Sequence, residues 1–117
     1  MTSLIACLGA GKGTWVQVSR LIESQAWESI VLITNPFGLE KFNNTKNAQL
    51  VVIDDRKDIL DLVEDIKKAL DGKFFGDVAV NFVSGDGKVH MALLSALLKL
   101  GVGIRLVDLT KDGFKEI

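Results

Sequence analysis

The sequence lacks the features that mark several large classes of protein. It has one cysteine and one histidine, too few for an internal disulfide or for a zinc-type cluster of these residues. Its 14 basic and 15 acidic residues are spread along the chain, which argues against a general DNA or RNA clamp and against a polybasic membrane anchor. No apolar run approaches the roughly 20 residues of a membrane-spanning helix, and the first residues lack a charged leader pattern. We therefore expect a cytoplasmic protein with no metal, cofactor or membrane attachment.

Five short apolar runs rich in valine, isoleucine and leucine are present instead. Most are continuous rather than alternating, which is typical of strands buried on both faces of a parallel sheet. They cover residues 3–8, 29–34, 49–54, 77–83 and 102–109. The only cysteine, Cys7, falls in the first run, where we expect it to be a small buried side chain.

Segments with helical spacing of apolar residues separate most of these runs. They cover residues 14–24, 57–71 and 88–100, and a looser connection spans 35–48. Strands that alternate with helices predict a parallel sheet with right-handed crossovers. We therefore expect a single α/β domain over residues 1–117, with a Rossmann-like doubly wound parallel sheet of five strands in the order 3-2-1-4-5.

The helix expected at 88–100 is apolar around most of its circumference. Its apolar residues are Val89, Met91, Ala92, Leu93, Leu94, Ala96, Leu97, Leu98 and Leu100. Either the helix is sunk deep in a small core, or a second subunit covers its outer side. We expect a homodimer that uses this helix.

Two glycine-rich turns follow the first and fourth expected strands, "GAGKGT" at 9–14 and "SGDGK" at 84–88. In the expected strand order these strands are neighbours at the switch point of the sheet, where open α/β sheets bind ligands. Glycine allows close backbone approach and a helix N-terminus favours an anion, so the turns predict a phosphate site. A third loop, at residues 34–38 after the second expected strand, is a candidate wall of the same site. The candidate ligand-binding residues are Gly9, Gly11, Gly13, Thr14, Ser84, Gly85 and Gly87, with Lys12 and Lys88 as cations and with His90, for which structural packing is the alternative.

Two better-known phosphate motifs do not fit. The P-loop requires a glycine five positions before Gly11, and that position holds Ala6 in the first expected strand. The dinucleotide fingerprint requires a third glycine where Thr14 stands. Neither a P-loop NTPase nor an NAD enzyme is therefore the preferred interpretation.

Residues 81–106, "NFVSGDGKVHMALLSALLKLGVGIRL", resemble the fourth-strand region of CARF domains, the CRISPR-associated Rossmann-fold sensors. The shared features are a glycine turn that ends in lysine, a helix rich in alanine and leucine with a methionine, and the strand opening near "LGV". A difference is Asp86 in the turn, which adds negative charge unless it points away. The resemblance implies a homodimer that binds a cyclic oligoadenylate across its two-fold axis, with the glycine loops around the phosphates.

A stand-alone domain of this kind is also similar to ring nucleases, which cleave the messenger without a metal by attack of a ribose 2′-hydroxyl. The resemblance then implies Lys88 as the first and Lys12 as the second candidate catalytic cation, while Thr14 and Ser84 hold phosphate oxygens. Three functions remain open: a sensor that only binds the messenger, a ring nuclease, and a domain that binds another phosphate-bearing ligand or serves as a protein-interaction subunit.

Overall fold

The computed structural model describes residues 2–117, along which strands and helices alternate. Within that range the strands are β1 (Leu4–Cys7), β2 (Ile30–Thr34), β3 (Gln49–Val52), β4 (Asp77–Asn81), β5 (Gly103–Thr110) and β6 (Gly113–Glu116). The helices are α1 (Trp15–Glu23), α2 (Pro36–Lys41), α3 (Ile59–Leu70) and α4 (Gly87–Lys99), with a short 3₁₀ turn, η1 (Lys12–Thr14), directly before α1. None of the helices described in this range is long and apolar enough to cross a membrane.

The sheet formed by residues 2–117 has the order β3-β2-β1-β4-β5-β6. Its first five strands pair in parallel, as in the register of Leu4 with Ile30 on one side and with Ala79 on the other. This confirms an α/β fold with a mostly parallel sheet, but the prediction of five strands was wrong. β6 adds an antiparallel edge to β5 through a hairpin in which Gly113 has a φ of 100°. Residues 111–116 contain no apolar run, so the sequence carried little signal for this strand.

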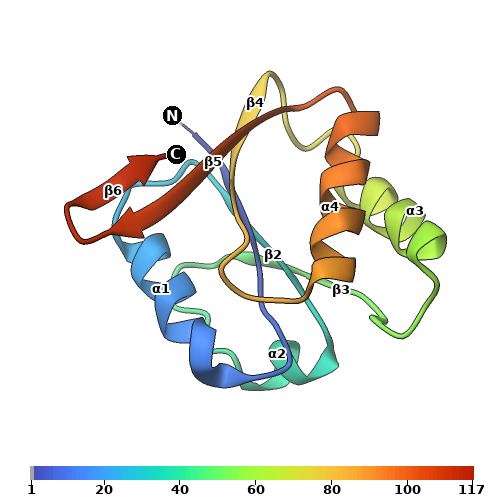
Figure 1. Ribbon diagram of the computed structural model, residues 1–117, viewed down its shortest axis with the longest axis horizontal. Coiled ribbons are helices and arrows are strands. Elements are labelled where there is room, and N and C mark those ends of the chain that lie inside the picture. Colours follow the sequence, from blue (N-terminus) through green and yellow to red (C-terminus); the bar gives the residue numbers. More distant parts are fainter. Residues whose placement is uncertain (1) are drawn as a thin grey trace.

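The two faces of the sheet have separate covers, as expected for a doubly wound arrangement. Leu4 and Ala6 of β1 pack in the cluster that contains the buried side of α1. Ile5 and Cys7 point the other way, into the cluster formed with α3 and α4. Figure 1 shows α1 on one side of the sheet and α3 with α4 on the other. Because helices cover both faces, most of the parallel strands are continuously apolar rather than alternating.

The helix predicted at 57–71 is α3, and its ends are set by local chemistry. Asp58 caps the N-terminus, where its carboxylate accepts from the backbone N–H of Leu60 at 3.2 Å. The apolar stripe faces inward, with Leu62 and Ile66 fully buried against the sheet and α4. Burying each of these side chains contributes about 1.5–3 kcal/mol before the entropy of ordering it is subtracted.

The connection 35–48 contains a short helix, α2, that the sequence did not indicate. Asn35 caps it by accepting from the backbone N–H of Gly38 at 2.8 Å, and Pro36 begins the first turn. Gly38 packs so closely on Thr34 that a Cβ there would collide with the threonine side chain. Six residues that include proline and glycine have too little periodicity to predict a helix.

Helix α4 divides into a buried and an exposed side. The completely buried residues are Ala92, Leu93, Ala96 and Leu97, and Val89 is only 7% exposed. On the opposite side Met91 and Leu98 are 60% and 64% exposed, and Leu94 is 37% exposed. The helix is therefore only half sunk in the core of this chain, and its outer side presents apolar side chains to the surroundings.

Asn81 ends β4 with a side chain that fixes the neighbouring backbone. Its amide nitrogen donates to the carbonyl of Val107 at 2.9 Å and to the carboxylate of Asp108 at 3.2 Å. Its amide oxygen accepts from the backbone N–H of Val83 at 3.0 Å. A buried amide with all these partners fixes the point from which the chain enters the turn before α4.

Candidate functional site

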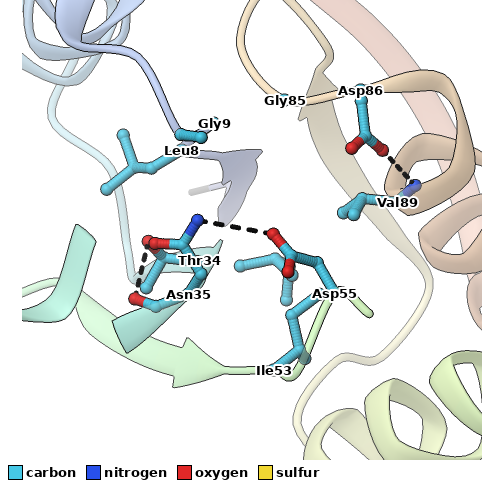
Figure 2. A pocket seen from close by; sticks show the side chains of 11 residues that line it. Leu8, Gly9, Thr34, Asn35, Ile53, Asp55, Gly85, Asp86 and Val89 are labelled. Atoms are coloured by element: carbon cyan, nitrogen blue, oxygen red, sulfur yellow. Dashed lines mark hydrogen bonds between the residues drawn. The ribbon is translucent and has the colours of Figure 1, made fainter. Parts of the chain in front are cut away.

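A cleft of about 140 Å³ lies at the carboxyl ends of β1, β2, β3 and β4, at the switch point of the sheet. Its lining comes from the ends of these strands, the segments that follow them and the start of α4 (Figure 2). The lining residues are Leu8, Gly9, Ala10, Ile33, Thr34, Asn35, Ile53, Asp55, Gly85, Asp86 and Val89. The turns after β1 and β4 thus meet at one cleft, with Thr34 and Asn35 as a further wall.

A buried serine hydroxyl joins the two glycine turns. Ser84 is 1% exposed, and its Oγ accepts from the backbone N–H of Gly9 at 2.8 Å. The same oxygen accepts from the hydroxyl of Thr14 at 2.6 Å. The two hydroxyls suggested by the sequence are therefore brought together, and both are engaged with protein groups rather than directed into the cleft.

Two of the glycines are required by close contact between these turns. A Cβ on Gly9 would lie 2.9 Å from the backbone nitrogen of Gly85. Gly85 has a φ of 102°, and a Cβ there would lie 2.9 Å from Nε2 of His90 and 3.2 Å from Cβ of Cys7. Each position needs glycine for packing alone, and both residues line the cleft.

His90 supports the turn after β4 from within α4. Its Nε2 lies 2.7 Å from the carbonyl oxygen of Ser84, so this nitrogen carries the proton and donates. The imidazole also packs against Phe82, with ring centroids 4.8 Å apart. The side chain is half-buried and acts on the backbone of the turn, which is the structural alternative considered above.

Cys7 lies beneath the same turn and is not poised for chemistry. Burial raises the pKa of its thiol to about 12, and the charge of Asp86 adds to the shift. The thiol therefore stays protonated at neutral pH and serves as a small apolar group in the core.

The segment after β3 contributes Asp55 to the cleft. The side-chain nitrogen of Asn35 lies 3.5 Å from a carboxylate oxygen of Asp55 across the cleft (Figure 2). Lys88 of α4 also contacts this segment, because its ammonium donates a hydrogen bond to the backbone carbonyl of Asp55 at 3.1 Å. The sequence analysis included Asn35 only as part of the candidate wall at 34–38. It could not predict the contact with Asp55, because nothing in the sequence shows that the ends of β2 and β3 approach each other.

The cleft is lined by carboxylates and by no lysine or arginine among residues 2–117. Asp55 contributes one carboxylate. Asp86 contributes the other, although one of its oxygens is occupied as the cap of α4, accepting from the backbone N–H of Val89 at 2.9 Å. Asp86 thus takes the position that an anion would occupy at this helix N-terminus. The interior of the cleft attracts hydrogen-bond donors rather than phosphate.

The remaining candidates lie outside the cleft lining. Gly11, Gly13 and Gly87 are exposed, and a Cβ on any of them would meet no atom within 4 Å. The ammonium of Lys12 lies 5.9 Å from the centre of the Phe37 ring, and Lys12 lines a different groove. The turn after β1 therefore sends its glycine backbone to the cleft and its lysine elsewhere.

Comparison with models of known protein families, with curated proteins and with solved structures finds no match to this chain. Across residues 2–117 no group of three histidine, cysteine or acidic side chains is placed to hold a metal ion. The fold and the cleft define an α/β protein with a small cleft of about 140 Å³ at its switch point, and its function is inferred from that site.

Proposed function

We propose that the switch-point cleft binds a nucleotide second messenger in the manner of CARF domains, and that the ligand is a cyclic oligoadenylate. The observation that carries the proposal is the junction between the two glycine turns. Ser84 ties the turn after β4 to Gly9 in the turn after β1, and Gly9 lines the cleft at the place where open α/β sheets bind ligands. A wall held in place before binding loses little entropy of ordering when a ligand arrives.

The charges of the cleft favour the sugar over the phosphates. Asp55 and Asp86 are acceptors for ribose hydroxyls, whereas a phosphate in the same space would be repelled by both. In our proposal a ribose hydroxyl donates to the Asp55 carboxylate. The phosphates remain outside, over the exposed residues 10–13.

The outer side of α4 supports a homodimer. Met91, Leu94 and Leu98 are exposed on the helix that starts at the cleft, and an apolar patch of this kind marks an interaction surface. A two-fold contact through this side pairs two clefts, and a ring of repeating nucleotides has matching symmetry. The free, buried Cys7 is in keeping with a cytoplasmic location.

The positions of the two lysines favour a protein that binds the messenger without cleaving it. A ring nuclease would need a cation beside the phosphate in the transition state. The ammonium of Lys88 is bound to the Asp55 carbonyl, and that of Lys12 lies over Phe37 outside the cleft. Cleavage therefore remains the alternative, to be decided by product analysis.

The test is a titration of the purified protein with cyclic tetra- and hexa-adenylate in EDTA, followed by chromatography of the nucleotides. We expect saturable binding of intact rings, weakened about tenfold by Asp55→Asn because a charged acceptor is lost. The matched control is Asp54→Asn, whose carboxylate binds the side chain of Arg56 and does not line the cleft. A ring of 2′-deoxyadenylates should bind the native protein about tenfold more weakly than the ribose ring does, because it lacks the hydroxyl that donates to Asp55.

The other outcomes are distinct. Linear products that disappear with Lys88→Ala would make the protein a ring nuclease. Failure of the native protein to bind either ring would overturn the proposal and leave another phosphate-bearing ligand or a protein partner. Sedimentation equilibrium in the same buffer checks the homodimer, which Leu98→Glu should dissociate because it places a charge on the apolar side of α4.

A further inference from the structure

A second and larger depression, which we call the α1 groove, lies on the opposite side of the sheet from α4. Its volume is about 710 Å³, and its lining includes Lys12, Trp15, Val16, Arg20, Lys41 and Leu109. These residues come from η1 and α1, from the end of α2 and from β5. The α1 groove therefore remains accessible in a dimer formed through α4.

The lining of the α1 groove is mainly apolar. Val16 is 55% exposed and Leu109 is 36% exposed, although both are large aliphatic side chains. Trp15 forms part of the base but is only 6% exposed, and it packs edge-on against Phe42 with ring centroids 5.9 Å apart. A large apolar group that enters here would remove the two aliphatic side chains from water, which is favourable in proportion to the area buried.

Cations outnumber anions in the α1 groove. Lys12, Arg20 and Lys41 are all exposed, and within residues 2–117 neither Lys12 nor Arg20 forms an ion pair. The only acidic side chain of the lining is Glu23, which is paired with Lys46 at 3.5 Å. The available charge in the groove is therefore positive.

We propose that the α1 groove is a docking site for an acidic peptide segment of another protein, with a large apolar side chain seated between Val16 and Leu109 and flanking carboxylates beside Lys12 and Arg20. Positive charge around an apolar depression is complementary to this chemistry and speeds the encounter with it. A single-stranded nucleic acid fits less well, because bases need open aromatic faces for stacking and Trp15 is almost fully buried. The inference does not depend on the ligand proposed for the cleft.

The groove is in contact with the cleft through one hydrogen bond. The indole N–H of Trp15 donates to the backbone carbonyl of Gly9 at 3.1 Å, and Gly9 lines the cleft. A peptide in the α1 groove would therefore contact Trp15, which is hydrogen-bonded directly to the turn that forms one wall of the cleft.

The test uses two pools of fluorescein-labelled hexapeptides and the full chain. One pool has two central leucines or phenylalanines flanked by aspartate or glutamate, and the other has lysine or arginine in place of the acids. We expect the acidic pool to bind in fluorescence anisotropy titrations, and Arg20→Glu to weaken its binding about tenfold. The matched control is Lys68→Glu, which also removes an exposed cation from the last turn of a helix, but on α3 at the other face.

A second variant tests the apolar part of the site. Val16→Ser should also weaken binding of the acidic pool, because it removes exposed apolar surface from the groove while leaving the buried side of α1 intact. The proposal is overturned if the acidic pool shows no saturable binding, if the basic pool binds equally well, or if Arg20→Glu and Lys68→Glu have the same effect. Binding of a single-stranded oligoadenylate that depends on Arg20, without binding of the acidic pool, would replace the peptide by nucleic acid.

Discussion

Replacing Ser84 with alanine should destabilise the protein even in the absence of any ligand. The substitution removes the acceptor of the Gly9 amide and of the Thr14 hydroxyl, which lie 2.8 Å and 2.6 Å from Ser84 Oγ. The amide is left without this partner at a cost of about 1–3 kcal/mol, and the half-buried hydroxyl adds about 0.5–1 kcal/mol because water can reach it. We expect the free energy of unfolding to fall by about 1.5–4 kcal/mol, which lowers the Tm by roughly 5–15 °C for a chain of this size.

Urea denaturation at equilibrium measures this change, with two control variants. Ser3→Ala removes a hydroxyl that bonds Ser29 at an exposed position, and it should change the free energy of unfolding by less than about 0.5 kcal/mol. Thr14→Val removes only the second donor to Ser84, and it should cost about 1 kcal/mol. If Ser84→Ala is as stable as the native protein, the hydroxyl does not hold the turns together, and a role in contacting a ligand becomes the better explanation for it.

The remaining predictions concern Gly85, which lines the cleft, and Cys7, which lies beneath the turn of Gly85. Gly85→Ala should lower the free energy of unfolding, measured by urea denaturation, by about 2–4 kcal/mol, because the φ of 102° is strained for alanine and its Cβ would press on His90. The control is Gly72→Ala, which has a φ of 75° and open space around it and should cost only about 1–2 kcal/mol. Equal costs for the two variants would refute the packing argument. The thiol of Cys7 should not react with a disulfide reagent at pH 8 until the chain unfolds, because burial raises its pKa to about 12. Since the folded state holds this proton more tightly than the unfolded chain does, the thiol should also make the free energy of unfolding fall as the pH rises above about 8.5; rapid labelling of the native protein would show that Cys7 is accessible.

The parallel part of the fold could be predicted because its signal is local. Most of the first five strands are continuous apolar runs, and α3 has an apolar stripe at helical spacing with an aspartate cap at Asp58. The missed elements lack these signals. β6 is short and partly charged, and its pairing with β5 depends on a hairpin at Gly113, while α2 depends on a cap and on close packing between Gly38 and Thr34.

The position of the site could be predicted from topology, but the direction of its side chains could not. The strand order brings the turns after β1 and β4 together, so Gly9 and Gly85 lie where the switch point predicts. The sequence cannot show that the hydroxyl of Ser84 is used within the protein, nor that Lys12 turns toward Phe37. These outcomes depend on contacts between segments far apart in the chain, which residue spacing alone does not contain.

The hairpin at the end of the sheet also bears on aggregation. Without β6, the eight-residue strand β5 would present unpaired backbone groups on which another chain could add a strand. β6 pairs with residues 107–110, and the backbone N–H of Ile117 donates to the carbonyl of Leu106 at 2.8 Å. The edge that remains is four residues long and carries Lys115 and Glu116. A short, charged edge is a poor template for fibril growth, so this antiparallel addition makes the β5 side of the sheet ill suited to edge-to-edge aggregation.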